Sequence, residues 1–239
     1  MAGKLYIVPT PVGNLGDMTP RAVEVLRNAD VILAEDTRTS AVLMKKFDIG
    51  TPMISHHKFN EHSTSSPVAD RIAAGETVAL VSDAGTPGIS DPGFMLSREC
   101  RTRGLEVETL PGPTALIPAL VNSGLPCDRF VFEGFLPQKK GRATRLAELA
   151  AEPRTFVVYE SPMRLARTLA ELAGACGPDR DAAVCREISK LHDTTHRGTL
   201  GELADFFAMN QPKGEIVIVI DGKKAEPRGA HQNKYRDNI

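Results

Sequence analysis

A twelve-residue stretch from Ser82 to Gly93 has the composition of a ligand-binding loop. Its sequence is SDAGTPGISDPG, and it follows four apolar residues, Val78–Val81, that predict a strand buried on both faces. Three glycines leave room for a ligand to approach the backbone, and Asp83 and Asp91 offer acceptors for an amine or a hydroxyl. A tight surface turn would explain one such glycine, but a loop this long and dense favours a binding site.

A second candidate site follows the apolar segment Val31–Ala34. Glu35, Asp36 and Arg38 come directly after this predicted strand, where open α/β sheets place their functional residues. The carboxylates could accept a proton or orient a hydroxyl group. A helix cap with a surface ion pair explains the same residues equally well, so both interpretations stay open.

A basic cluster forms the third candidate. Lys139, Lys140, Arg142 and Arg145 lie within seven residues, and no carboxylate interrupts them. In a chain of net charge −1, this is the best local candidate for contact with phosphate. The alternative is a solvated helix start. Cations at a helix N-terminus oppose the helix dipole, which favours an anionic partner.

Histidines gather between residues 55 and 62. His56, His57 and His62 lie near Glu61 in a segment that we expect to be a loop, but their spacing matches no established ligand pattern. We therefore predict no metal site, and we interpret these residues as polar substrate contacts or ordinary surface.

The elements that must position these residues alternate along the chain. Buried-strand candidates at Leu5–Val8, Val31–Ala34, Val78–Val81 and Val107–Leu110 alternate with helical segments, which predicts a parallel α/β sheet. One of the helices would bury the apolar face of Phe94, Met95, Leu96 and Cys100. A break at 123–126 places a domain boundary after residue 122, so the predicted domains are 1–122 and 123–222. Residues 223–239 lack apolar periodicity and carry five Lys and Arg against two acids, which predicts a disordered basic tail.

Composition narrows the class of protein. A length of 239 residues suits one large or two small domains, and 41% hydrophobic and 25% charged residues are typical of a soluble protein. We expect no secretory signal and no membrane span, and four scattered cysteines indicate reduced thiols in the cytoplasm. Aromatic residues make up only 5%, which argues against an extended nucleic-acid surface built on stacking. Walker A, GxGxxG and GxSxG motifs are absent.

Seven motifs, in order, resemble one known family. They are LYIVPTPVGNL from Leu5, AEDTR from Ala34, SDAGTPGISDPG from Ser82, PGPTA from Pro111, FLP from Phe135, YESP from Tyr159 and KGE from Lys213. Together they resemble the tetrapyrrole methylase superfamily, most closely its branch of small-subunit ribosomal RNA methyltransferases. The resemblance spans Leu5 to about residue 221, nearly the whole chain.

The resemblance implies an enzyme dependent on S-adenosyl-L-methionine. It implies an α/β fold of two domains with the cofactor cleft between them, a mainly parallel N-terminal sheet and a mixed C-terminal sheet. The implied reaction is 2′-O-methylation of the ribose of a cytidine in the decoding region of 16S rRNA, with the small ribosomal subunit as partner. The implied assembly is a homodimer.

The resemblance also implies roles for single residues. The cofactor-binding residues would be Pro9 at the cleft floor, Asp83, Ala84, Gly85 and Ile89 at the amino-acid end, Thr114 and Ala115 beside it, and Tyr159 and Gly214 at the adenosine. The departures from the family pattern include Thr114, where a serine is expected, and Met163, where a histidine is expected.

The implied chemistry is an in-line attack of the 2′-oxygen on a sulfonium methyl group, for which positioning supplies much of the acceleration. Glu35, Asp36 and Glu160 are candidates for the base or for orienting the ribose, and positioning without a distinct base is an equal alternative. Phosphates would be held by Arg38, Lys139, Lys140, Arg142 and Arg145. Two other functions stay open: a corrin or porphyrin-precursor methyltransferase, which would retain pigment, and a non-catalytic RNA-binding protein, which would bind RNA without the cofactor.

Overall fold

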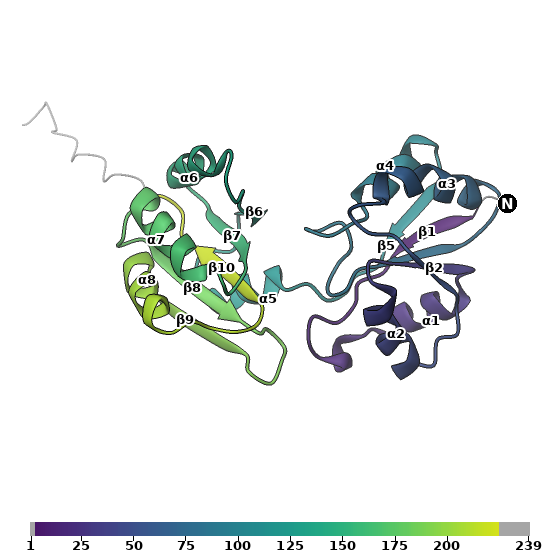
Figure 1. The fold of residues 1–239 in the computed structure, drawn as a ribbon, viewed down its shortest axis with the longest axis horizontal. Helices are drawn as coiled ribbons and strands as arrows, with labels where there is room; N and C mark the ends of the chain where they lie inside the picture. Colours follow the sequence, from purple (N-terminus) through teal and green to yellow (C-terminus); the bar gives the residue numbers. More distant parts are fainter. Residues whose placement is uncertain (1–2, 225–239) are drawn as a thin grey trace, which may run out of the picture.

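The computed structural model describes residues 3–224, which form two α/β domains joined in the middle of the chain (Figure 1). The N-terminal domain contains a five-stranded sheet with the order β3-β2-β4-β1-β5, in which every neighbouring pair is parallel. Its strands are β1 (Lys4–Ile7), β2 (Val31–Ala34), β3 (Met53–Ser55), β4 (Val78–Val81) and β5 (Glu106–Thr109). This confirms the predicted parallel sheet.

Helices cover both faces of the N-terminal sheet (Figure 1). On one face, α1 (Pro20–Asn28) and α2 (Thr37–Lys46) bury Leu26 and Met44, and on the other, α3 (Glu61–Ala73) and α4 (Phe94–Thr102) bury Ile72 and Leu96. Burial from both sides explains why β2 and β4 are continuous apolar segments. Helix α1 begins as its sequence predicts, because the Thr19 side chain accepts a hydrogen bond from the Ala22 N–H ahead of Pro20.

The C-terminal domain contains a mixed sheet with the order β6-β7-β10-β8-β9. Strands β6 (Phe130–Phe135) and β7 (Thr155–Glu160) are parallel, whereas β10 (Ile216–Ile220), β8 (Asp181–Arg186) and β9 (Thr194–Thr199) join it in antiparallel pairs. Helices α6 (Arg142–Ala151), α7 (Leu165–Cys176) and α8 (Leu200–Met209) cover one face. The predicted mixed sheet is thereby confirmed.

Helix α5 (Leu116–Ser123) covers the other face of the C-terminal sheet. Its buried residues Leu116, Ala119 and Leu120 pack against Val157 and Val219 of that sheet. Because α5 belongs to the second core, we propose that the boundary between the domains lies in the Pro111–Ala115 turn rather than after residue 122. Of the predicted tail 223–239, residues 225–239 lie outside the described part of the chain.

Two further features differ from the sequence predictions. Helix α3 begins at Glu61, so His62 is helical rather than in a loop. The short strand β3 was not predicted, because only one of its three residues is even partly buried. Within residues 3–224, no helix has the length and apolar character needed to span a bilayer.

Candidate active site

A cavity of about 420 Å³ lies where the two domains meet. Its N-terminal wall comes from the loops that follow β2 and β4, and its C-terminal wall from the ends of β6, β7 and β10. In the N-terminal sheet, the chain leaves β1 toward β2 on one side and leaves β4 toward β5 on the other. Such a reversal opens a crevice at the carboxyl ends of the strands, which is where open α/β sheets bind ligands.

Most residues predicted to bind the cofactor line this cavity. They are Asp83, Ala84, Gly85, Ile89, Thr114, Ala115, Tyr159 and Gly214. Pro9 is not among the lining residues. It lies beneath Gly112, where an added Cβ atom would come within 2.7 Å of the Pro9 side chain. Pro9 therefore supports the Pro111–Ala115 turn, and its place at the cleft floor stays a prediction.

The loop 82–93 is held open by its backbone conformation. Gly85 has a φ of +81° and exchanges two hydrogen bonds of 2.9 Å with Thr10, which ties this loop to the segment after β1. Ser90 also has a positive φ, +68°, which is uncommon for a residue with a side chain. Across the cleft, Gly134 of β6 approaches Ser90 so closely that an added Cβ would lie 3.0 Å from the serine Oγ. The two domains are thus in contact at the rim of the cavity.

Three carboxyl groups face the cavity from the N-terminal domain: Glu35, Asp83 and Asp91. Burial raises the pKa of Asp91 to about 7, and the negative charges of Glu35 and Asp83 add to the effect. Burial also raises the pKa of Glu35, again with a contribution from Asp83. Carboxylates that repel one another in a half-buried cavity favour a cationic ligand, and the pKa of Asp91 allows this group to exchange a proton near neutral pH.

Asp36 and Glu160 are not available as bases. The Asp36 carboxylate caps α2 and forms a two-point ion pair with Arg38, whose hydrogen bonds lower the pKa of Asp36 to about 2. Glu160 lines the cavity but is only 4% exposed. Its carboxylate accepts hydrogen bonds from the Ser161 N–H, the Arg164 side chain and the Thr168 hydroxyl at 2.7–2.8 Å. These contacts correct two of the three predicted base candidates to structural roles and leave Glu35.

The C-terminal wall of the cavity combines two aromatic rings with a glycine. Phe135 and Tyr159 line the cavity, with ring centroids 5.7 Å apart in an edge-to-face arrangement. Burial raises the pKa of Tyr159, so its hydroxyl stays protonated. Gly214 has a φ of +95°, and an added Cβ would overlap the Glu187 side chain at 2.3 Å. This wall can therefore accept a flat ring close to the backbone.

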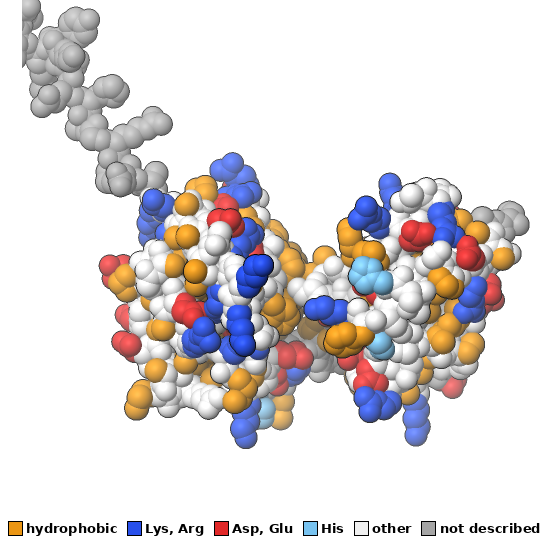
Figure 2. All heavy atoms as spheres, turned by 45° about the horizontal axis from the view of Figure 1, so that its top comes forward, with side chains coloured by type: hydrophobic (Ala, Val, Ile, Leu, Met, Phe, Trp, Pro, Cys, Tyr) orange, Lys and Arg blue, Asp and Glu red, His pale blue; other side chains and the backbone are white. Residues whose placement is uncertain are grey.

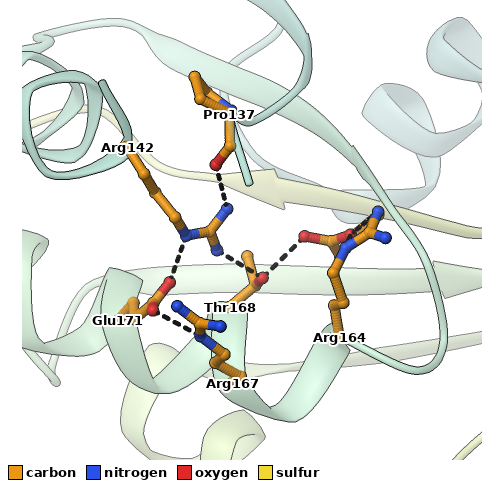
Figure 3. Close-up of polar contacts among 7 residues, drawn as sticks. Pro137, Arg142, Arg164, Arg167, Thr168 and Glu171 are labelled. Atoms are coloured by element: carbon orange, nitrogen blue, oxygen red, sulfur yellow. Dashed lines mark hydrogen bonds and ion pairs between the residues drawn. The ribbon is translucent and has the colours of Figure 1, made fainter. Parts of the chain in front are cut away.

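The predicted phosphate-binding residues divide into two groups. Arg142 is buried, with 7% exposure, and it donates to Glu171 (2.6 Å), to the Pro137 carbonyl (3.0 Å) and to Thr168 (2.7 Å) (Figure 3). This burial contradicts the expectation that Arg142 holds a phosphate. Arg145 pairs with Glu133 and Glu148, and Arg38 pairs with Asp36. Lys139 and Lys140 are exposed and form no ion pair within residues 3–224.

Several lining residues lie outside the set assigned to the cofactor, although the sequence already offers Asp91 as an acceptor for an amine or a hydroxyl. Val12, Thr86, Asp91 and Glu215 also line the cavity. Asp91 and Thr86 belong to the predicted loop, but the sequence does not reveal that the positive φ of Ser90 sets the path of the backbone into Asp91. Val12 reaches the site through the Thr10–Gly85 pairing, which no local pattern indicates.

For His56, the structure corrects the prediction that the histidines are polar substrate contacts or ordinary surface. His56 is fully buried, and its Nδ1 lies 2.9 Å from the Thr64 hydroxyl, so burial lowers its pKa. Within the part of the chain that the structure describes, no group of three or more His, Cys, Asp or Glu side chains could hold a metal ion.

Comparisons with known proteins agree with this geometry. Residues 4–204 match the family model described as Tetrapyrrole (Corrin/Porphyrin) Methylases. The chain is 51% identical to ribosomal RNA small subunit methyltransferase I of Synechocystis sp. over 99% of its own length and 86% of that protein. Proteins of the same name from Escherichia coli O157:H7 and Thermotoga maritima are 46% and 45% identical. They cover 94% and 93% of this chain, and this chain covers 79% and 100% of them.

Solved structures share the fold. Diphthine synthase superposes with a TM-score of 0.71 at 15% identity, covering 94% of this chain and 92% of its own. The methyltransferase CobJ gives 0.69 at 19% identity, with 95% and 98% covered. Uroporphyrin-III C-methyltransferase from Thermus thermophilus, complexed with S-adenosyl homocysteine, gives 0.60 at 20% identity, with 91% and 97% covered. At these identities the likeness concerns the fold alone.

Proposed function

The chain belongs to the tetrapyrrole methylase family, and on that premise we propose that it transfers a methyl group from S-adenosyl-L-methionine to small-subunit rRNA, at the ribose 2′-oxygen of a cytidine in the decoding region. The observation that carries this proposal is the cavity of about 420 Å³ between the domains, with carboxylates on one wall and aromatic rings on the other. The names of relatives at 45–51% identity support rRNA as the acceptor.

The cavity suits the proposed cofactor. S-adenosyl-L-methionine carries a positive sulfonium, a positive amino group and a flat adenine ring. Asp83, Asp91 and Glu35 match the positive groups, and the aromatic wall of Phe135 and Tyr159 matches the ring. A volume of about 420 Å³ lies within the usual range for small-molecule sites, about 300–1,000 Å³.

The residues of this chain then have defined tasks. When bound, the cofactor supplies an electrophilic methyl group on positively charged sulfur. Asp83 and the backbone around Gly85 hold its amino-acid end, and the C-terminal wall excludes water from the adenosine. Glu35 and Asp91 have raised pKa values, so either can accept the proton that leaves the ribose hydroxyl. Lys139 and Lys140 offer free cations to the phosphates of the RNA.

The alternative acceptor is a tetrapyrrole precursor, as in the solved structures of similar fold. The exposed Lys139 and Lys140 would attract either acceptor, because a tetrapyrrole precursor carries several carboxylates, whereas the names of the similar proteins favour rRNA. Homodimeric assembly, a cytoplasmic location and the choice between free rRNA and an assembled subunit stay predictions.

The test combines binding with product analysis. Calorimetric titration of the full-length protein with S-adenosyl-L-methionine should show binding that Asp83→Ala weakens and Gly85→Val abolishes, whereas Gly50→Ala, at an open position, leaves it unchanged.

Radiolabelled methyl transfer is then compared among small ribosomal subunits, free 16S rRNA and uroporphyrinogen. A 2′-O-methyl group blocks alkaline cleavage at its own nucleotide, which locates the product. Labelling of the tetrapyrrole alone would reject the proposed acceptor, and RNA binding without cofactor binding would reject catalysis.

A further inference from the structure

Helix α4 begins directly after the loop that lines the cavity, and its outward face is not covered by the rest of the domain. The sequence predicts that Phe94 packs in the core together with Leu96 and Cys100. In the structure Leu96 and Cys100 are fully buried, whereas the Phe94 side chain is 60% exposed. The prediction for Phe94 is therefore wrong, and this exposed ring lies three residues beyond Asp91 of the cavity wall.

Two arginines share the outward face with Phe94. Arg98 and Arg101 follow it at helical spacings of four and seven, and all three line one surface hollow of about 500 Å³. Neither arginine forms an ion pair within residues 3–224. The nearest acid on the helix, Glu99, is instead paired with Arg103 at 2.7 Å. The hollow thus combines an apolar ring with two free positive charges.

A second exposed aromatic residue, Phe59, lies in the turn that precedes α3. The Glu61 carboxylate accepts hydrogen bonds from the N–H groups of Gly93 (2.8 Å) and Met95 (3.0 Å), which fixes the start of α3 against the start of α4. Phe59 lies two residues before Glu61 and is 94% exposed, and the neighbouring Lys58 is exposed as well. We call Lys58, Phe59, Phe94, Arg98 and Arg101 the aromatic–basic patch.

The patch begins close to the cavity along the chain, because Phe94 lies three residues beyond Asp91 of the cavity wall. In Figure 2, hydrophobic, His and Lys or Arg side chains lie together on the side of the N-terminal domain that faces the other domain. Lys and Arg side chains also lie on the C-terminal domain in this view. A polyanion that enters the cleft would therefore meet positive charge on both domains.

We propose that the aromatic–basic patch binds single-stranded RNA that flanks the methylated nucleotide, with bases stacked on Phe94 and Phe59 and phosphates held by Arg98, Arg101 and Lys58. Exposed aromatic rings beside unpaired cations are the combination that binds single strands. A protein partner of ordinary hydrophobic type would leave the arginine charges uncompensated. This inference rests on the proposed function and specifies how the rRNA is held. Although aromatic residues are few in this chain, two local rings suffice for a small platform.

The test separates stacking from simple apolar contact at one position. Full-length Phe94→Leu keeps apolar area but removes the aromatic face, whereas Phe94→Tyr keeps the face. We expect Phe94→Leu to weaken binding of a single-stranded oligoribonucleotide of the decoding region about tenfold, and Phe94→Tyr to bind like the wild type. Arg98→Ala with Arg101→Ala should make the salt dependence of log K shallower by about 1.4. Lys45→Ala with Lys46→Ala, at the far end of α2, is the matched control and should change neither quantity.

Each outcome has a defined meaning. Cofactor binding by calorimetry should stay unchanged in all variants, because none of the substituted side chains lines the cavity. If the wild type methylates small subunits but the patch variants bind RNA equally well, the inference is wrong while the proposed function stands. If Phe94→Leu changes the oligomeric state in sedimentation, the patch is an interface between copies and the inference is likewise wrong. If the wild type neither binds nor methylates RNA, the proposed function itself fails and the inference falls with it.

Discussion

The Thr168 hydroxyl donates a hydrogen bond of 2.7 Å to Oε2 of Glu160, and both side chains are almost completely buried. The same hydroxyl accepts a hydrogen bond of 2.7 Å from Nη2 of Arg142 (Figure 3). The Glu160 carboxylate also accepts from Arg164 and from the Ser161 N–H. One side chain of α7 therefore links the start of α6 to the turn 160–162 that forms part of the cavity wall.

Removal of the Thr168 hydroxyl tests this link. Thr168→Val keeps the shape but leaves a buried carboxylate oxygen and a buried guanidinium N–H without a partner, so we expect a loss of about 1–3 kcal/mol in the free energy of unfolding. Thr168→Ser keeps the hydroxyl and should recover most of the loss. Urea denaturation of both variants measures the difference. Equal stability of Thr168→Val and the wild type would contradict the structural role of the network.

Gly214 offers a second test, on the same C-terminal wall of the cavity. An added Cβ would lie 2.3 Å from the Glu187 carboxylate, whose Oε1 accepts a hydrogen bond from the Glu215 N–H (2.9 Å). Gly214→Ala must displace Glu187 and also strain a φ of +95°, so we expect a destabilisation of about 1–3 kcal/mol and weaker cofactor binding.

The matched control for Gly214→Ala is Gly174→Ala in α7. An added Cβ there meets no atom within 4 Å, and alanine in a helix should stabilise by about 0.5–1 kcal/mol. Thermal unfolding and calorimetry of the two variants give the comparison. A Gly214→Ala protein that binds the cofactor like the wild type would show that this loop can shift without cost.

The sequence predicts the sheets well because burial on both faces leaves a clear pattern. Val78–Val81 and Ile216–Ile220 are continuous apolar segments, and both are fully buried central strands. The sequence does not predict the sheet that α5 covers. Leu116 and Leu120 indicate that one face of this helix is buried, but an apolar face has no preference for one sheet over another.

The sequence predicts only part of the candidate site, because it shows local composition but not which distant residues meet after folding. Glycines and aspartates of the loop 82–93 are recognisable because few other structures need them at this density. The role of Arg142 was not predictable, because its partners Thr168 and Glu171 lie 26 and 29 residues further along the chain. A basic residue in sequence becomes a phosphate ligand only if folding leaves its charge unpaired, and here α7 supplies the partners.

Glu35 and Asp36 are neighbours with opposite environments, which gives a third test. Glu35 faces the cavity with a raised pKa, whereas Asp36 caps α2 and holds Arg38. If Glu35 accepts the ribose proton, Glu35→Gln should lower the rate of methyl transfer about 10²-fold with little effect on stability. Asp36→Asn should remain active because asparagine is also a good cap, whereas Asp36→Ala should cost about 1 kcal/mol of stability. Single-turnover methylation and urea denaturation measure the two effects, and an inactive Asp36→Asn would reverse the assignment.

The last prediction concerns Asp91, whose pKa is raised from an ordinary value of 3.8 to about 7 by burial and by the charges of Glu35 and Asp83. Between pH 3.8 and about pH 7, Asp91 is mostly protonated in the folded protein but mostly ionised in the unfolded chain. Stability should therefore fall as pH rises through this window, and the loss is complete above the folded pKa. A cationic ligand binds the ionised Asp91 carboxylate more tightly than the protonated one. Cofactor affinity should therefore increase as pH rises toward 8.

Asp91→Asn isolates this contribution, because the amide fills the same space without titrating. The variant should be more stable than the wild type at pH 8, and the advantage should shrink toward pH 5 as the wild-type carboxyl takes up its proton. Urea midpoints at the two pH values, without ligand, measure this difference. In calorimetry the variant should bind the cofactor more weakly and should lose the rise of affinity with pH that the wild type shows. If Asp91→Asn is more stable than the wild type by the same amount at both pH values, Asp91 does not titrate between them. Another group would then have to account for any pH dependence of cofactor binding.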